Sequence, residues 1–149
     1  MKTRPLTILL VEDNPDHAEM IRRTLEGGRT TQRLLHVHDG EEAISYLSRE
    51  GIYSDHARYP LPDLLLLDLR LPKVSGLEVL EWMRSRTNLR GIATVILTTS
   101  NAEGDMTNAY RLGAISYLVK PFAIEEFARL LDACSHYWLS WNRFPELID

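Results

Sequence analysis

Continuous apolar runs, each followed by a helical pattern, constrain the fold of this 149-residue chain more than any other feature. The runs are Leu6–Val11, Leu64–Leu67, Ala93–Thr98 and residues 115–119, with a weaker one at 33–37. Runs that do not alternate with polar residues suit strands covered on both faces, as in a parallel sheet. The alternation of strand and helix therefore predicts a doubly wound, five-stranded parallel α/β sheet, (βα)5.

Local signals place the helices between these runs. Asn14 followed by Pro15 is typical of a helix N-cap and first helical residue, and the glycines at 27–28 would end that helix. Further helices are expected over residues 41–50, 76–88, 102–112 and 124–141.

The composition indicates one globular domain in a reducing compartment. The length suits a single domain over residues 1–149, and the net charge of −4 gives no reason to expect nucleic acid as a partner. The first apolar run is too short for a signal peptide or a membrane span. The single cysteine, Cys134, lies in an apolar helical stretch and is predicted to be a buried thiol. We therefore expect a cytoplasmic protein that binds neither nucleic acid nor membrane.

Polar residues stand at the ends of four predicted strands. Glu12 and Asp13 follow the first strand, Asp68 the third, and Lys120 the fifth, while Thr98 ends the fourth. The carboxyl ends of parallel strands meet at one edge of the sheet. Three carboxylates with one lysine invite a hard divalent cation such as Mg²⁺. A carboxylate such as Asp68 can form an acyl phosphate, with Lys120 and Thr98 as donors to the phosphoryl oxygens.

Each of these residues also has a structural explanation. An acidic pair after a strand is common, Asp68 could cap a turn, Thr98 could bond to backbone, and Lys120 could be a solvated charge. Each explanation is stronger than function for one residue taken alone. Their coincidence at four strand ends of one edge favours a functional site.

The segments around these residues closely resemble the response-regulator receiver family of two-component signalling. The matching segments are Ile-Leu-Leu-Val-Glu-Asp-Asn at 8–14, Leu-Leu-Asp-Leu-Arg-Leu-Pro at 66–72, Gly-Leu-Glu-Val-Leu at 76–80, Val-Ile-Leu-Thr-Thr-Ser at 95–100, and Gly113-Ala114 through Lys120-Pro121-Phe122. They occur in the family's order and spacing over about residues 6–135. The resemblance implies the flavodoxin-like receiver fold and a phosphoryl group accepted from a histidine kinase in a phosphorelay.

The resemblance also implies a role for each matched position. Asp68 resembles the phospho-acceptor, which becomes 4-aspartylphosphate. Asp13 resembles the direct ligand of Mg²⁺ or Mn²⁺, and Glu12 a ligand through water. Arg70 is expected to offer its backbone carbonyl to the metal.

The switch and phosphate-binding positions are matched as well. Thr98 resembles the switch hydroxyl, Tyr117 the switch aromatic, and Lys120 the phosphate-binding lysine, with a cis peptide bond expected before Pro121. Phosphorylation would draw Thr98 inward and let Tyr117 rotate. That change would repack the face formed by the fourth helix, fifth strand and fifth helix.

Two positions depart from the family pattern. Arg70 stands where a small polar residue is common, and Thr99 where a small residue such as alanine is usual. The Arg70 side chain could bind a phosphoryl oxygen or alter the lifetime of the phospho-aspartate. Thr99 could limit the access of water or a phosphatase.

A long loop and a distinctive ending narrow the resemblance. Residues 51–62, the Leu-Thr-Thr-Ser at 97–100 and the Tyr-Trp-Leu at 137–139 are similar to stand-alone receivers encoded beside phytochrome-type histidine kinases. The resemblance implies a bacteriophytochrome-type sensor kinase as partner. Because the chain ends soon after the fifth helix, we expect no DNA-binding output module.

The family also suggests where the kinase docks. His17, Met20 and Thr24 fall on one stripe of the first helix, and Phe122 lies in the loop after the fifth strand. Met20 is equally compatible with a partly buried core position.

Aromatic residues continue beyond the point where the last helix would outrun the sheet, in an extension over about residues 136–149. The candidate interface residues are Tyr137, Trp138, Trp141, Phe144 and Leu147. An exposed aromatic patch usually marks an interface, so we expect an isologous homodimer through this arm and the face of the fourth helix, fifth strand and fifth helix. The alternative is that the tail folds back on its own domain.

The main enzymatic alternative is a phosphatase that uses an aspartyl-phosphate intermediate. Such enzymes carry a second acid two residues after the nucleophile, whereas this chain has Arg70 there. A receiver that no longer accepts phosphate is disfavoured because every acceptor-site position is filled. We therefore expect a phospho-acceptor switch rather than an enzyme.

Overall fold

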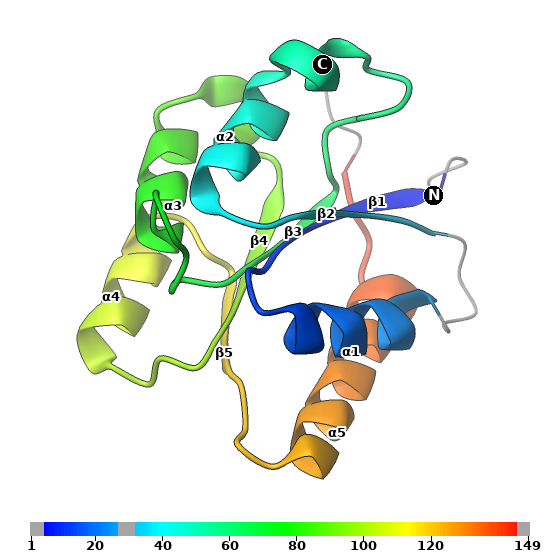
Figure 1. Ribbon diagram of the computed structural model, residues 1–149, viewed down its shortest axis with the longest axis vertical. Helices are drawn as coiled ribbons and strands as arrows, with labels where there is room; N and C mark the ends of the chain where they lie inside the picture. The colour runs from blue at the N-terminus through cyan, green and yellow to red at the C-terminus, as the bar shows by residue number, and fades with distance from the viewer. Residues whose placement is uncertain (1–4, 27–31, 146–149) are drawn as a thin grey trace.

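Five parallel strands form one sheet in the order β2-β1-β3-β4-β5, with helices on both faces (Figure 1). The computed structural model describes residues 5–26 and 32–145. The strands are β1 (Leu6–Val11), β2 (Gln32–Val37), β3 (Leu64–Leu67), β4 (Ala93–Thr98) and β5 (Ser116–Val119). The helices are α1 (Pro15–Glu26), α2 (Gly40–Ser48), α3 (Gly76–Arg84), α4 (Glu103–Arg111) and α5 (Ile124–Ser135), with short 3₁₀ turns at Gly51–Ser54 and Thr87–Leu89 and a π-helical segment at His136–Trp141. The predicted doubly wound α/β sheet is confirmed.

The continuous apolar runs are explained by burial on both faces of the sheet. In β3, Leu65 and Leu67 pack toward α2, α3 and α4, whereas Leu64 and Leu66 pack toward α1 and α5 (Figure 1). All four side chains are at most 1% exposed. A strand between two helical layers has no solvent face, and this is why alternation is missing from its sequence.

The first helix begins where its sequence predicts. Asn14 Oδ1 accepts hydrogen bonds from the backbone N–H groups of Asp16 and His17, at 2.9 and 3.1 Å, and Pro15 is the first helical residue. These contacts satisfy backbone donors that a helix N-terminus leaves free. The predicted stop at residues 27–28 lies outside the described residues.

The last helix is not α-helical over its whole predicted length. The residues at 124–141 are helical throughout, but the α-helix ends at Ser135 and a π-helical segment follows. Cys134 and Leu139, five residues apart, are both buried, whereas Trp141 is 70% exposed. Because a π-turn bonds i to i+5, it shifts the buried stripe by about one residue relative to an α-helix.

The long loop after α2 is packed by its own aromatic side chains. The Tyr46 hydroxyl donates to the Pro60 carbonyl at 2.7 Å, and the Tyr53 ring lies 5.0 Å from Tyr46 and 4.9 Å from Tyr59 between ring centroids. These contacts anchor the loop beside α2, away from the carboxyl ends of the strands. Within the described ranges, no helix combines the length and hydropathy needed to cross a membrane.

Candidate functional site

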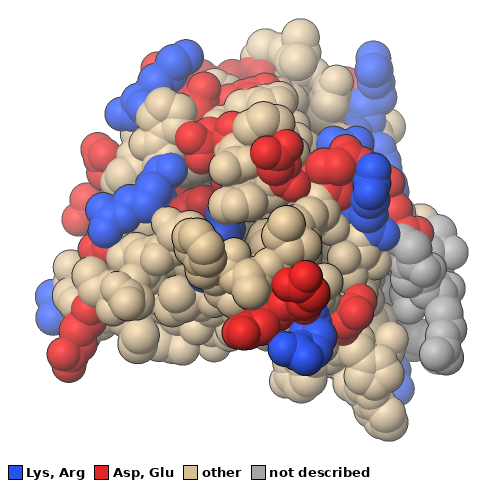
Figure 2. Space-filling model, turned by 60° about the horizontal axis from the view of Figure 1, so that its bottom comes forward, with Lys and Arg blue, Asp and Glu red and all other residues tan. Residues whose placement is uncertain are grey.

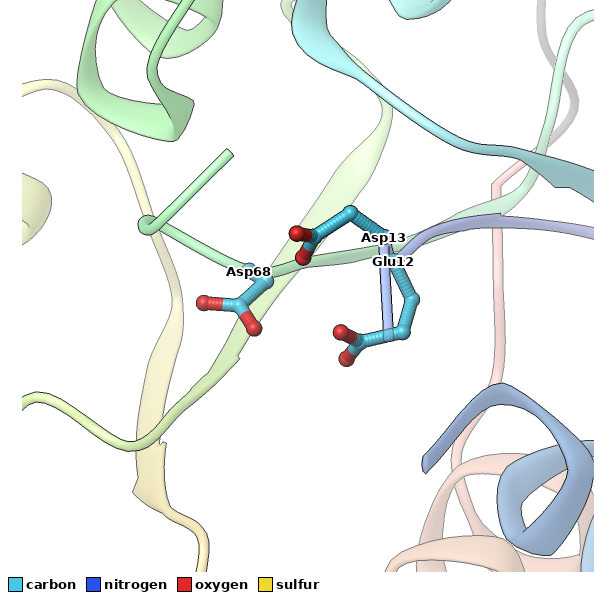
Figure 3. Close-up of side chains that lie close together, drawn as sticks. All are labelled: Glu12, Asp13 and Asp68. Carbon is cyan, nitrogen blue, oxygen red and sulfur yellow. The ribbon is translucent and has the colours of Figure 1, made fainter. Parts of the chain in front are cut away.

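The predicted acidic cluster lies at the point between β1 and β3 where the order of the strands in the sheet reverses. β1 pairs with β2 on one side and with β3 on the other, so the residues after β1 and β3 lie side by side at the carboxyl edge of the sheet. Glu12 and Asp13 follow β1 and Asp68 follows β3, and Figure 3 shows their side chains close together at that edge. One carboxylate oxygen from each residue lies within 4.8 Å of the others.

A buried lysine that follows the edge strand β5 reaches this cluster. Lys120 Nζ lies 2.6 Å from Glu12 Oε1 and 2.8 Å from Asp68 Oδ2, and its side chain is only 2% exposed. The Lys120 backbone N–H donates to the Thr98 carbonyl at 2.7 Å, which continues the pairing of β4 with β5. A buried charge needs such partners because burial removes its hydration. Lys120 is therefore not the solvated charge of the structural alternative.

The charges of this cluster do not balance. Burial raises the pKa of Glu12 above its ordinary value, and the neighbouring Asp68 adds to this, although the Lys120 ammonium acts in the opposite direction. Asp13 is exposed at the open side of the cluster. Hard oxygen ligands in excess over one ammonium, with one carboxylate open to solvent, fit a divalent cation that retains several waters.

Two backbone contacts fix the position of Asp68 after β3. The Arg70 N–H donates to Asp68 Oδ1 at 3.0 Å. At Gly76, which begins α3, an added Cβ would lie 2.3 Å from the Asp68 carbonyl oxygen and 2.7 Å from the Leu69 Cα. The start of α3 can therefore pack this closely against the backbone of Asp68 and Leu69 only with glycine there. The Arg70 carbonyl as a metal ligand stays a prediction.

The two predicted switch residues share a hydrogen-bonding partner. Thr98 is wholly buried, and its Oγ1 accepts from the Ser100 N–H at 3.3 Å. The Tyr117 hydroxyl donates to the Ser100 carbonyl at 3.0 Å. The backbone of Ser100 therefore connects both side chains, and the Thr98 hydroxyl makes the backbone contact that its structural alternative anticipated.

The Arg70 side chain has protein partners in the segment that follows the neighbouring strand β4. Its Nη2 lies 2.8 Å from Asp105 Oδ2 and donates to Ser100 Oγ at 3.2 Å, while Ser100 Oγ donates to the same Asp105 oxygen at 2.6 Å. This cluster connects the β3–α3 segment to the first turn of α4. Sequence reasoning missed Ser100 and Asp105 in this role, and the only signal was an acidic residue early in α4. Thr99 beside them is exposed.

The proposed docking residues divide into two groups. Phe122 is fully exposed, whereas Met20 is half-buried among the core residues between α1 and α5. The Thr24 hydroxyl donates to the Met20 carbonyl at 3.0 Å. His17 faces the site, with Nδ1 3.0 Å from Lys120 Nζ, a contact that the sequence did not predict.

The peptide bond before Pro121 is trans, so the expected cis bond was wrong. An X-Pro bond still favours the trans form by about 0.5–1 kcal/mol, and nothing in the local sequence requires the alternative. Pro121 follows Lys120 directly and leads into the exposed Phe122.

The aromatic tail is partly self-packed. Leu139 is buried, and Trp138 and Phe144 pack against the core between α1 and α5, as the fold-back alternative anticipated. Tyr137 and Trp141 remain 53% and 70% exposed. The last residue predicted for the arm, Leu147, lies outside the described residues.

Charged side chains of both signs are interspersed with uncharged ones on the face of Figure 2. On the part of this face that the structure describes, lysine and arginine do not gather into a stripe of the kind that follows a nucleic-acid backbone.

Comparison with known proteins places these features in a family. The response regulator receiver domain family matches residues 8–132. This chain belongs to that family. The receiver is 43% identical over 141 residues to the probable methanogenesis regulatory protein FilR2 of Methanothrix harundinacea, a match that covers 95% of this chain and 88% of the relative. It is 33% identical to the response regulator Rcp1 of Synechocystis, over 95% of this chain and 94% of Rcp1.

Solved structures agree with this assignment. The receiver superposes on the Mn²⁺-bound form of Rcp1 with a TM-score of 0.91 at 32% identity, covering 95% of this chain and all (100%) of the other. It superposes on the phosphorylated cyanobacterial phytochrome response regulator RcpA with a TM-score of 0.89 at 35% identity, covering 96% and 100%. The predicted receiver fold and the likeness to phytochrome-associated response regulators are confirmed.

Proposed function

We propose that this receiver accepts a phosphoryl group from a histidine kinase onto Asp68 and uses the modification to change its protein contacts. One observation carries the proposal: a buried lysine bridges Glu12 and Asp68 beside the exposed Asp13. Two relatives support it, because Rcp1 has been solved in a Mn²⁺-bound form and RcpA in a phosphorylated form.

The transfer needs one nucleophile and several positioned charges. A carboxylate oxygen of Asp68 forms a bond to the phosphorus of a phosphohistidine, while the phosphorus–nitrogen bond breaks and its electron pair stays with the imidazole. The departing imidazole takes a proton from solvent. A divalent cation held by Glu12, Asp13 and Asp68 would supply positive charge at the phosphoryl oxygens. Lys120 turns its ammonium from the carboxylates to one of those oxygens.

The signal then passes to the face of α4, β5 and α5. The Thr98 hydroxyl leaves the Ser100 N–H and donates to a phosphoryl oxygen, which disturbs the backbone that also accepts from Tyr117. Release of Tyr117 repacks this face. A local change of charge thereby biases an element with two arrangements.

Phytochrome-type sensor kinases are the proposed donors. The relative RcpA is described as a cyanobacterial phytochrome response regulator, and other similar structures are described as bacteriophytochrome response regulators. Phe122, which is fully exposed and follows Lys120 by two residues, is the proposed docking contact for the kinase. Docking through Met20 and Thr24 would use only their half-exposed surfaces.

A second copy of the chain is the proposed partner of the output face. The exposed apolar residues there are Met106, Tyr110, Ile115, Val119 and Ile124, to which the arm adds Tyr137 and Trp141. Apolar side chains on adjoining elements form a surface that an isologous contact would bury.

Phosphorylation of the full chain tests the proposal. With Mg²⁺ and phosphoramidate, the wild type should gain one phosphoryl group, seen as a retarded band on phosphate-affinity gels, and a chelator should abolish the band. Asp68→Asn should give no band. The matched control is Asp16→Asn, an exposed acid nearby that should leave labelling unchanged. Labelling of Asp68→Asn at the wild-type level would refute the proposal, as would a wild type that takes no phosphoryl group.

A further inference from the structure

His17 completes the surroundings of the Lys120 ammonium. The ammonium has three N–H groups, and its partners among the described residues are Glu12 Oε1 at 2.6 Å, Asp68 Oδ2 at 2.8 Å and His17 Nδ1 at 3.0 Å. They come from the ends of β1 and β3 and from the first turn of α1. Two of these partners are carboxylates of the acceptor site, and His17 is the only one of the three that is not.

The chemistry of this contact fixes the state of the ring. An ammonium can only donate, so His17 Nδ1 must present its lone pair and the proton of a neutral ring must lie on Nε2. Burial, and then the positive charge of Lys120, lower the pKa of His17 below its ordinary value, which favours this neutral form.

Two further contacts hold the ring in place. Its centroid lies 5.5 Å from that of Phe127 on α5, at an interplanar angle of 80°. The His17 backbone N–H donates to the N-cap side chain of Asn14 at 3.1 Å, which fixes the first turn of α1. The imidazole is therefore packed between α1 and α5 with its acceptor nitrogen aimed at Lys120.

We propose that His17 is a positioning residue for phosphoryl transfer, which holds the Lys120 ammonium beside Asp68 through a hydrogen bond to Nδ1. The inference rests on the proposed phosphorylation of Asp68. During transfer, Glu12 and Asp68 share their negative charge with other positive groups, so their hold on Lys120 weakens. A neutral acceptor outside the carboxylate cluster keeps its hold throughout. His17 thus limits the directions in which the flexible lysine side chain can turn.

Substitutions that remove or restore the acceptor test this role in the full-length protein. His17→Ala deletes the acceptor, and His17→Asn restores one, because the amide oxygen of asparagine occupies nearly the same place as Nδ1. Glu19→Ala is the control, since Glu19 is exposed on the same helix and pairs only with Arg23 among the contacts described. Phosphoramidate labelling rates and the affinity for beryllofluoride, both with Mg²⁺, are the readouts.

Loss of one charge-assisted hydrogen bond should lower the labelling rate and the beryllofluoride affinity of His17→Ala by about tenfold. His17→Asn should recover to within about threefold of the wild type, because the acceptor rather than the ring is what Lys120 needs. Glu19→Ala should match the wild type. Equal rates for His17→Ala and the wild type, or equal losses in the alanine and asparagine variants, would overturn the assignment.

The ring itself provides a readout that does not depend on phosphorylation. The ¹⁵N shifts of His17 should show an unprotonated Nδ1 and a protonated Nε2 at neutral pH, and a protonated Nδ1 would overturn the assignment even if labelling is slow in the variant. If the wild type shows the expected tautomer but takes no phosphoryl group, the proposed function fails while the contact with Lys120 stands.

Discussion

The proposed acceptor site and the C-terminal arm both place side chains in unfavourable surroundings, which are the interior for the charges of the site and solvent for the aromatic rings of the arm. At the site, Lys120 is surrounded by partners from three other segments of the same chain. In the arm, Leu139 finds a place in the core while Trp141 stays 70% exposed. The fold supplies partners for the buried charge of the site, whereas it buries only part of the apolar surface of the arm.

This difference separates the two kinds of function. Buried charges must be positioned within about an ångström, so the site needs rigid elements on every side. Exposed aromatic side chains carry no such demand, and a partner can bury them without that precision. The proposed phosphoryl transfer therefore depends on the sheet edge, and the proposed partner contacts depend on the arm and the adjoining face.

The largest expected effect comes from removing the lysine. Lys120→Met should lower the free energy of unfolding by about 3–5 kcal/mol in the absence of metal, because Glu12 and Asp68 lose their buried counter-charge. Urea denaturation near pH 7 measures it, and added Mg²⁺ should recover part of the loss. Lys73→Met is the control, since Lys73 is 59% exposed and pairs with Asp39 and Glu41 at 3.6 and 3.8 Å. Equal losses in both variants would remove the distinction between the site and the surface.

A smaller loss of stability should distinguish the buried residue of the arm, Leu139, from the exposed Trp141. Leu139→Ala should cost about 2–4 kcal/mol of stability, because it leaves a cavity between α1 and α5. Trp141→Ala should change stability by no more than about 0.5 kcal/mol, as expected for an exposed side chain. Thermal and urea unfolding of the two variants measure both values. A large loss for Trp141→Ala would mean that the whole arm is core.

The pH dependence of stability tests whether Cys134, near the end of α5 where the arm begins, is buried. Burial raises the pKa of the Cys134 thiol from its ordinary 9.0 to about 11. Below pH 9 the thiol is neutral in both states, so its contribution is fully present; as pH rises from 9 to 11 the unfolded chain loses the proton first, and stability falls. The wild type should lose roughly 2–3 kcal/mol more than Cys134→Ala across this window. If the unfolding free energies of the two proteins, measured in reductant, change equally with pH, the Cys134 thiol is accessible to solvent and the prediction is wrong.

The smallest effect on stability should accompany the largest effect on assembly. Tyr137→Ala combined with Trp141→Ala should leave the unfolding free energy nearly unchanged, yet convert a dimer to a monomer by light scattering. This pair is a sharper test than truncation after Ser135, which would also remove the buried Leu139. A monomeric wild type would contradict the proposed interface.

The fold was predictable because its signals are local. β1, β3 and β4 have the bounds that their apolar runs predict, and Asn14 caps α1 as its sequence indicates. The acidic cluster was also predictable, since parallel strands bring their carboxyl ends to one edge whatever their side chains.

The sequence by itself therefore determined the order of the elements and which residues form the acidic cluster. Only the tertiary structure decided which distant side chains contact one another around the cluster. Lys120 and His17 are 103 positions apart, and Arg70 and Asp105 are 35 apart. It also decided which residue of the arm is buried, because one π-turn places Leu139 in the core and leaves Trp138 only half-buried. Hydrophobic periodicity records which face of an element is buried, but pairing between distant side chains depends on packing geometry that no local pattern contains.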